Sequence, residues 1–188
     1  MKIEYLEVRK DFRDKFEELI PREIGELLDA RKAFILGAAV REEEKCFAAG
    51  ALGFEVDTER DEEGEWVSAI EILWLFVGEA DRNKGVGEGL LFRLFDFAEG
   101  VGAEDIFLSL PATEDGAVFA AYFEEFGFVF EPVYMDRNGN LAAVGDTLEI
   151  TLGEKDKKLA KYWDDSFSTE AVALLRGRYE GFEEEEDV

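Results

Sequence analysis

Residues 66–100 read WVSAIEILWLFVGEADRNKGVGEGLLFRLFDFAEG, and most of the fold prediction rests on them. The first part, Trp66 to Val77, is rich in β-branched and aromatic residues and predicts a long strand. A polar loop, Gly78 to Lys84, follows it. Gly85 to Gly100 then places apolar residues on one face of a helix. Because Ile106 to Leu110 reads as another strand, the order predicts a βαβ unit with two parallel strands.

The rest of the chain up to residue 152 carries further strand and helix patterns. The charged stretch 41–45 suits a hairpin turn, and 57–65 predicts a second, very acidic turn. We therefore expect an α/β fold with a mixed, mostly antiparallel central sheet flanked by helices. The expected strands are 2–9, 33–40, 46–56, 129–135 and 147–152, and the expected helices are 12–20, 24–28 and 115–126.

The composition changes after Leu152. Lys155 to Trp163 and Thr169 to Tyr179 predict two helices, which would pack on the domain or at a homodimer interface. The last stretch, residues 183–187, is entirely acidic. The expected division of the chain is a domain over 1–152, a helical extension over 153–182 and an acidic tail over 183–188.

The composition is that of a globular protein. The chain has 188 residues, 47% of them apolar, which is enough for one domain with a core. The longest apolar run, Ile72 to Val77, is far too short to cross a bilayer. Residues 1–10 alternate charged and apolar side chains, unlike a signal peptide. We expect a soluble, cytoplasmic protein.

Acidic residues outnumber basic residues 46 to 21, which gives a formal charge of −25. Such a surface repels nucleic acid and anionic membranes, so neither is an expected partner. Solubility or adaptation to salt is the favoured explanation of this acidic excess, and attraction of a cationic substrate is the alternative. His is absent and Cys46 stands alone, which argues against His-assisted nucleophilic catalysis, a disulfide and any metal site. We expect Cys46 to be a small core residue.

The glycine loop at 82–87 has the features of an anion site. Glycines let the backbone approach phosphate oxygens, and the first N–H groups of the following helix point the same way. Arg82 and Lys84 add two positive charges. The last glycine of a dinucleotide fingerprint would fall at residue 90, whereas this chain has Gly89, and the G-K-S/T ending of a P-loop is missing.

The loop resembles the acetyl-CoA motif R/Q-x-x-G-x-G/A of the GNAT superfamily, with Arg82, Gly85 and Gly87 at its fixed positions. A second stretch, YFEEFGF at 122–128, resembles the F-Y-E-K-x-G-F stretch of that family. The resemblance covers residues 2–152. It implies a GNAT-like fold that binds acetyl-CoA and transfers the acetyl group to an amine.

The resemblance also implies which residues bind the coenzyme. The loop would hold the pyrophosphate, and the pantetheine arm would bond to the backbone of the preceding strand. The amide N–H of Leu75 would polarise the thioester carbonyl. The implied cofactor-binding residues are Leu75, Phe76, Val77, Arg82, Asn83, Lys84, Gly85, Val86 and Gly87.

Glu71 is the candidate general base. An amine with a pKa near ~10 is mostly protonated at neutral pH, so transfer needs a base. Glu71 interrupts an apolar strand, and its even offset from Leu73 and Leu75 predicts that it shares their face. It also precedes Arg82 by the spacing that family members with a strand glutamate base use. The alternatives are a solvent-facing position at the sheet edge or an ion pair with an Arg.

The candidate general acid departs from the family pattern. Many members have a Tyr where this chain has Phe123, and an Asn where it has Gly116. Tyr122 could serve if the helix is turned, although a core or rim position is the competing interpretation. Ser109 is a further candidate at a strand end. CoA also needs little help to leave, because thiols have a pKa near ~8.5.

The sequence therefore predicts an N-acetyltransferase that moves an acetyl group directly from acetyl-CoA to a primary amine of a small molecule or peptide. The acidic turn at 57–65 leaves a polycationic acceptor open. The alternative is a catalytically weak GNAT-like module for acyl-CoA binding, regulation or protein interaction, which Phe123 and Gly116 favour. A homodimer is also left open.

Overall fold

The computed structural model of this chain describes residues 2–135, 141–144 and 172–182. The chain divides into two compact units, residues 1–106 and 107–188. The fold is a mixed α/β arrangement with a mostly antiparallel sheet and flanking helices, as the sequence predicted. None of the helices in the described part of the chain is both long and apolar enough to span a membrane.

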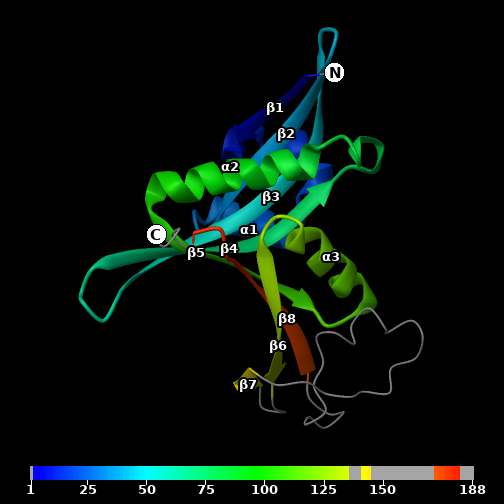
Figure 1. The fold of residues 1–188 in the computed structure, drawn as a ribbon. Helices are drawn as coiled ribbons and strands as arrows, with labels where there is room; N and C mark the ends of the chain where they lie inside the picture. The colour runs from blue at the N-terminus through cyan, green and yellow to red at the C-terminus, as the bar shows by residue number, and fades with distance from the viewer. Residues whose placement is uncertain (1, 136–140, 145–171, 183–188) are drawn as a thin grey trace, which may run out of the picture. The chain divides into compact units, whose positions relative to one another are not determined.

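In the first unit, four strands pair antiparallel in the order of the sequence. Helix α2 (Val86–Val101) lies across one face of these strands (Figure 1). The 3-10 helix η1 (Lys10–Leu19) and helix α1 (Arg22–Asp29) also belong to this unit. The strands are β1 (Lys2–Glu7), β2 (Phe34–Glu42), β3 (Lys45–Arg60) and β4 (Trp66–Val77).

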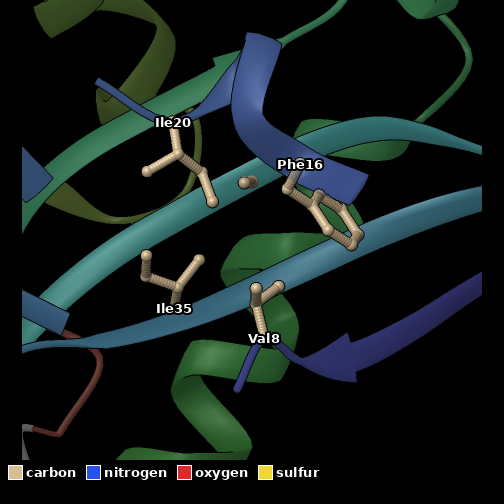
Figure 2. Packing of buried hydrophobic residues seen from close by; sticks show 5 residues of the cluster. Val8, Phe16, Ile20 and Ile35 are labelled. Carbon is tan, nitrogen blue, oxygen red and sulfur yellow. The ribbon is translucent and has the colours of Figure 1, made fainter. Parts of the chain in front are cut away.

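One part of the core lies beneath η1. Figure 2 shows the side chains of Val8, Phe16, Ile20 and Ile35 converging there, and Ala51 completes the cluster. All five side chains are buried. Burying large apolar side chains of this kind contributes about 1.5–3 kcal/mol each, so this cluster fixes η1 on the sheet.

The helix α2 buries its own apolar stripe. Leu90, Leu91, Leu94 and Ala98 have no exposed surface, and they recur at the spacing of one helix face. The helix ends at Gly102, which is left-handed with φ 65°, a conformation that glycine adopts without strain. This helix therefore matches the sequence prediction in type and to within a residue or two in bounds.

The acidic turn after β3 is shorter than the sequence predicted. The strand β3 continues to Arg60, whose guanidinium lies 4.7 Å from the ring centre of Trp66 on the next strand. The turn is confined to residues 61–65 because Asp61 organises it. The Asp61 carboxylate accepts hydrogen bonds from the backbone N–H groups of Glu63 and Glu65, at 2.9 and 2.8 Å.

Cys46 is exposed, so the expectation of a core position is wrong. It lies just after the turn at Glu43 and Glu44, within a run of exposed residues, 41–47. The apolar segment becomes buried only from Ala49 onward.

In the second unit, the strands pair antiparallel in the order β5-β8-β6-β7. Helix α3 (Glu114–Glu124) packs on β6 and β8. The strand β5 begins in the first unit and continues into the second. The strand bounds are β5 (Ala103–Pro111), β6 (Phe128–Met135), β7 (Leu141–Val144) and β8 (Val172–Tyr179).

The helix expected at Thr169 to Tyr179 is wrong, because residues 172–179 form the strand β8. This strand bonds to β5 on one side and to β6 on the other. Gly177 is needed at its centre, since a side chain there would run into the rings of Phe130 and the side chain of Leu108. Long-range pairing and packing thus override the local helix propensity.

The remaining expectations concern the part of the chain after β6. The strand β7 was not expected. The expected strand at 147–152, the helix at 155–163 and the acidic tail lie outside the described residues. The division of the chain at residues 152 and 182 stays a prediction.

Candidate functional site

The strand β4 contains a β-bulge at Leu73. Trp74 lies opposite Gly53 on β3, and Ile72 lies opposite Phe54, the very next residue of that strand. Leu73 is therefore an extra residue without a partner of its own in the register. A bulge of this kind reverses the alternation of side chains along the strand.

The two faces of β3 are identified by what they touch. The ring of Phe54 lies 5.0 Å from the ring of Phe97 in α2. A Cβ atom on Gly53 would lie 2.9 Å from the side chain of Ile24 in α1. Since consecutive residues of a strand point to opposite faces, α2 covers one face and α1 covers the other.

Glu71 therefore lies on the α1 face of the sheet. Its register partner is Glu55, which is two residues from Gly53 on β3, whereas Leu75 lies opposite Leu52 and so faces α2. The expectation that Glu71 shares a face with Leu75 is wrong, because the bulge falls between them. Glu71 is half-buried.

Two aromatic side chains share the α1 face with Glu71. The rings of Trp74 and Phe76 stack with centres 5.9 Å apart and an angle of 8° between their planes. Trp74 packs against the buried cluster beneath η1, and Phe76 is 37% exposed. The α1 face of β4 thus carries a carboxylate followed by a flat apolar surface.

The glycine turn after β4 brings a helix terminus close to the end of the strand. A short 3-10 turn, η2 (Glu79–Asp81), is followed by Asn83 and Gly85, both left-handed with φ 59° and 79°. The N–H of Gly78 bonds to the carbonyl oxygen of Ala49 at 2.8 Å, which fixes the start of the turn on β3. Gly85 is the N-cap of α2, and no side chain caps the helix there.

The first N–H groups of α2 are the donors that the turn presents. The bond from the N–H of Gly89 to the carbonyl oxygen of Gly85, 3.0 Å long, is the first of the helix. The N–H groups of Val86, Gly87 and Glu88 come before it and have no partner within the helix. Together with the helix dipole they make this end of α2 attractive to an anion.

The charges around the turn differ from the sequence expectation. Arg82 is exposed, and its Nε donates to the carbonyl oxygen of Val77 at 3.3 Å. Lys84 is paired with Asp81, with 3.0 Å between Nζ and Oδ1. Glu88 lies in the first turn of α2, with its carboxylate near Gly85. Arg82 therefore contributes more free positive charge here than Lys84 does.

Gly50 on β3 explains how the helix comes so close. A Cβ atom on Gly50 would lie 2.9 Å from both the carbonyl oxygen of Phe76 and the side chain of Val86. Any other residue would push β4 and α2 away from β3. The nine residues expected to bind the coenzyme thus lie in one continuous segment of the first unit, 75–87, and Glu71 lies in the same strand.

Tyr122 lies in α3, within the second unit. It is half-buried, and its ring makes edge contacts with Phe126 at 5.1 Å and Phe123 at 5.6 Å. Phe123 is 2% exposed and packs on Phe128. Tyr122 is therefore at the rim of an aromatic cluster, which matches the competing interpretation from the sequence.

The glycine at 116 has a steric cause. A Cβ atom there would overlap the carbonyl oxygen of Pro111. The N–H of Gly116 donates to the hydroxyl of Thr113 at 3.1 Å, which caps α3. An Asn at this position would need the end of β5 to move, so the departure from the family pattern follows from local packing.

Ser109 accepts a hydrogen bond from Arg176 on β8, 2.7 Å long. The same guanidinium lies 4.8 Å from the ring centre of Phe107.

Within the described residues, acidic and cysteine side chains form no group of three or more that could hold a metal ion.

An uncapped helix start that follows a glycine turn at the end of a strand is a site for an anionic group such as a phosphate. The family model for the acetyltransferase (GNAT) family matches residues 3–128. The chain therefore belongs to the GNAT acetyltransferase family. A comparison with curated proteins found no match.

Solved structures share the fold. NAA60 of Arabidopsis thaliana in complex with acetyl-CoA has a TM-score of 0.63 at 11% identity, over 95% of this chain and 98% of that one. An acetyltransferase of Bacillus subtilis in complex with CoA has a TM-score of 0.57 at 16% identity, over 95% and 98%. An IAA acetyltransferase of Bacillus cereus has a TM-score of 0.53 at 12% identity, over 95% and 99%.

Proposed function

We propose that this chain is an N-acetyltransferase that moves an acetyl group from acetyl-CoA to a primary amine of a small molecule or peptide. The observation that carries the proposal is the turn 82–87, in which two left-handed residues deliver the uncapped start of α2 to the end of β4. Family membership supports it, since the matched model includes both elements.

The donor side of the proposed site is built from backbone groups. The N–H groups of Val86 and Gly87 bind the pyrophosphate together with Arg82, while the backbone of β4 holds the pantetheine arm at Leu75 and Val77. Phe76 contributes only its backbone to this side, because its side chain is on the α1 face. Gly85 leaves room for a diphosphate beside the backbone, and Gly50 lets β4 and the start of α2 pack close to β3.

The acceptor side is built around Glu71. The acceptor nitrogen loses a proton to the Glu71 carboxylate, directly or through water, and attacks the thioester carbonyl carbon. The carbon–sulfur bond then breaks, the electron pair leaves with sulfur as CoA thiolate, and the nitrogen gives its remaining extra proton to the thiolate or to water as the amide forms. Glu55 lies opposite Glu71, and like charges placed so close favour a cationic acceptor between them. Polyamines are therefore included among the proposed acceptors.

A CoA-release assay over an amine panel tests this function. The panel contains monoamines, polyamines and peptides with a free N-terminus. We expect amine-dependent release that falls by ~100-fold or more in kcat in Glu71→Gln, because a positioned base contributes about that much. Glu55→Gln is the matched control, since the same change on the opposite strand should affect only the KM for the amine.

The assay also has a clear negative result. If Glu71→Gln keeps the native kcat from pH 7 to 9, Glu71 is not the base. If no amine releases CoA although calorimetry detects acetyl-CoA binding, the chain is a binding or regulatory module. The buried Phe123 and the forced glycine at 116 favour this second candidate, because both positions lack the polar groups that the family pattern has.

The cytoplasmic location and the homodimer belong to the same proposal. Light scattering on the purified protein, with and without CoA, tests the oligomeric state. A monomer at all concentrations used in the assay would remove the homodimer from the proposal without affecting the proposed chemistry.

A further inference from the structure

Tyr5 of β1 reaches the start of α2, a contact between residues 80 positions apart in the chain. The ring of Tyr5 lies in a notch that Gly89 leaves in the helix. A Cβ atom on Gly89 would overlap the hydroxyl oxygen and the ring carbon beside it. Gly89 therefore has a packing role, although it has an ordinary helical backbone.

The hydroxyl of Tyr5 donates to the carbonyl oxygen of Gly85, with 3.5 Å between the oxygens. The same carbonyl accepts the first helical bond, from the N–H of Gly89. The carbonyl of Gly85 and the N–H of Val86 belong to one rigid peptide plane and point in opposite directions. A hydrogen bond from Tyr5 to the carbonyl of Gly85 therefore also sets the direction of the Val86 N–H.

Burial, more than the neighbouring charges, keeps the Tyr5 hydroxyl protonated and therefore a donor. Burial raises the pKa of the Tyr5 hydroxyl, the Arg93 charge lowers it and the Glu88 carboxylate raises it, with a net upward shift. The guanidinium of Arg93 lies 5.8 Å from the centre of the ring. The hydroxyl therefore stays protonated throughout the physiological range, as the hydrogen bond to Gly85 requires.

We propose that Tyr5 is a positioning residue of the phosphate-binding turn. The first strand, through Tyr5 and the notch at Gly89, holds the peptide of Gly85 and Val86 in the orientation that binds the diphosphate of acyl-CoA. This inference rests on the proposed function, because it assumes that the turn binds that group. It adds a residue outside the motif as a determinant of coenzyme affinity.

Calorimetry with CoA tests the inference on folded protein at 25 °C. Tyr5→Phe keeps the ring in the notch and removes only the hydroxyl, so we expect the Kd for CoA to rise about threefold. Gly89→Ala pushes the ring out, and we expect a rise of about tenfold or more. Gly100→Ala is the matched control, because a Cβ atom there meets nothing within 4 Å. Its Kd should stay within about twofold of native.

Two further readouts separate positioning from general stability. The KM for the amine should be unchanged in Tyr5→Phe, and the amide resonances of Val86 and Gly87 should shift in this variant without ligand. If Gly89→Ala does not fold, Tyr5→Phe still decides the question through these readouts. Native affinity and unchanged resonances in Tyr5→Phe overturn the inference, whereas a native protein that binds no CoA overturns the proposed function instead.

Discussion

The starts of the helices α2 and α3 differ in one respect that bears on function. At α3, Thr113 has the extended backbone of an ordinary N-cap, and its hydroxyl accepts the N–H of Gly116. At α2, the N-cap is the left-handed Gly85, which has no side chain to offer. A side chain thus satisfies one of the first donors of α3, whereas no side chain caps the start of α2.

Both helices have acidic residues in the first turn, which the helix dipole favours: Glu88 in α2, and Glu114 and Asp115 in α3. Acidic residues are thus present at both helix starts, whereas a side-chain cap is present only at α3. The comparison implies that changes at the start of α2 affect coenzyme affinity, whereas changes at the start of α3 affect only stability.

The largest expected effect is at Gly85. An alanine at φ 79° is strained by about 1–2 kcal/mol, so Gly85→Ala should relax the turn and raise the Kd for CoA about tenfold. Gly64→Ala is the control, because Gly64 is also left-handed, with φ 87°, and lies in the exposed acidic turn. Calorimetry and denaturant unfolding of both variants measure the difference. Equal Kd values for CoA in the two variants would show that the conformation of Gly85 does not determine coenzyme affinity.

A smaller effect is expected at the cap of α3. Thr113→Ala removes a side-chain acceptor from the helix start and should lower the free energy of unfolding by about 1 kcal/mol. Urea unfolding measures this change, and the Kd for CoA should be the same as in the native protein. A loss of affinity in this variant would mean that the two helix starts are not independent.

The smallest expected effect is at Glu88, and it has the opposite sign. Its carboxylate stabilises the helix start but repels a diphosphate, so Glu88→Gln should lower the Kd for CoA about threefold and reduce stability by about 0.5 kcal/mol. The gain in affinity should shrink in high salt because the interaction is screened. Glu114→Gln, in the first turn of α3, should reproduce the stability loss alone. Weaker CoA binding in Glu88→Gln would contradict this account.

The parts of the fold that were predicted correctly depend on local signals. The strand Trp66–Val77 has the same bounds in the structure, because aromatic and β-branched residues mark its whole length. The turn and α2 follow from glycines and from an apolar stripe at helical spacing. Local sequence is enough for such elements, since the chain within a few residues determines them.

The parts that were not predicted depend on distant residues. The strand β8 contains leucine and alanine and reads as a helix, but β5 and β6 each leave a row of backbone groups that only a strand can pair. The bulge at Leu73 shows only in the register with β3. Neither pairing partner is visible from the segment itself.

The candidate site divides in the same way. The residues of the turn could be named from their motif, whereas the face on which Glu71 lies could not, because one extra residue changed it. Tyr5 was missed because its contact spans most of the first unit. Gly89, a glycine within the helix, was the available signal of a close neighbour.

The extra residue at Leu73 also has a consequence for how this chain could be altered. The strand β4 leads into the turn at 82–87, and the Glu71 side chain lies on the α1 face of that strand whereas Leu75 faces α2. Removing Leu73 would turn Glu71 to the face of Leu75 and leave the residues of the turn unchanged. Chains that share the turn motif but lack this extra residue would therefore carry the strand glutamate on the other face of the sheet. When such domains are redesigned or recombined, the register of the strand has to be checked as well as the motif.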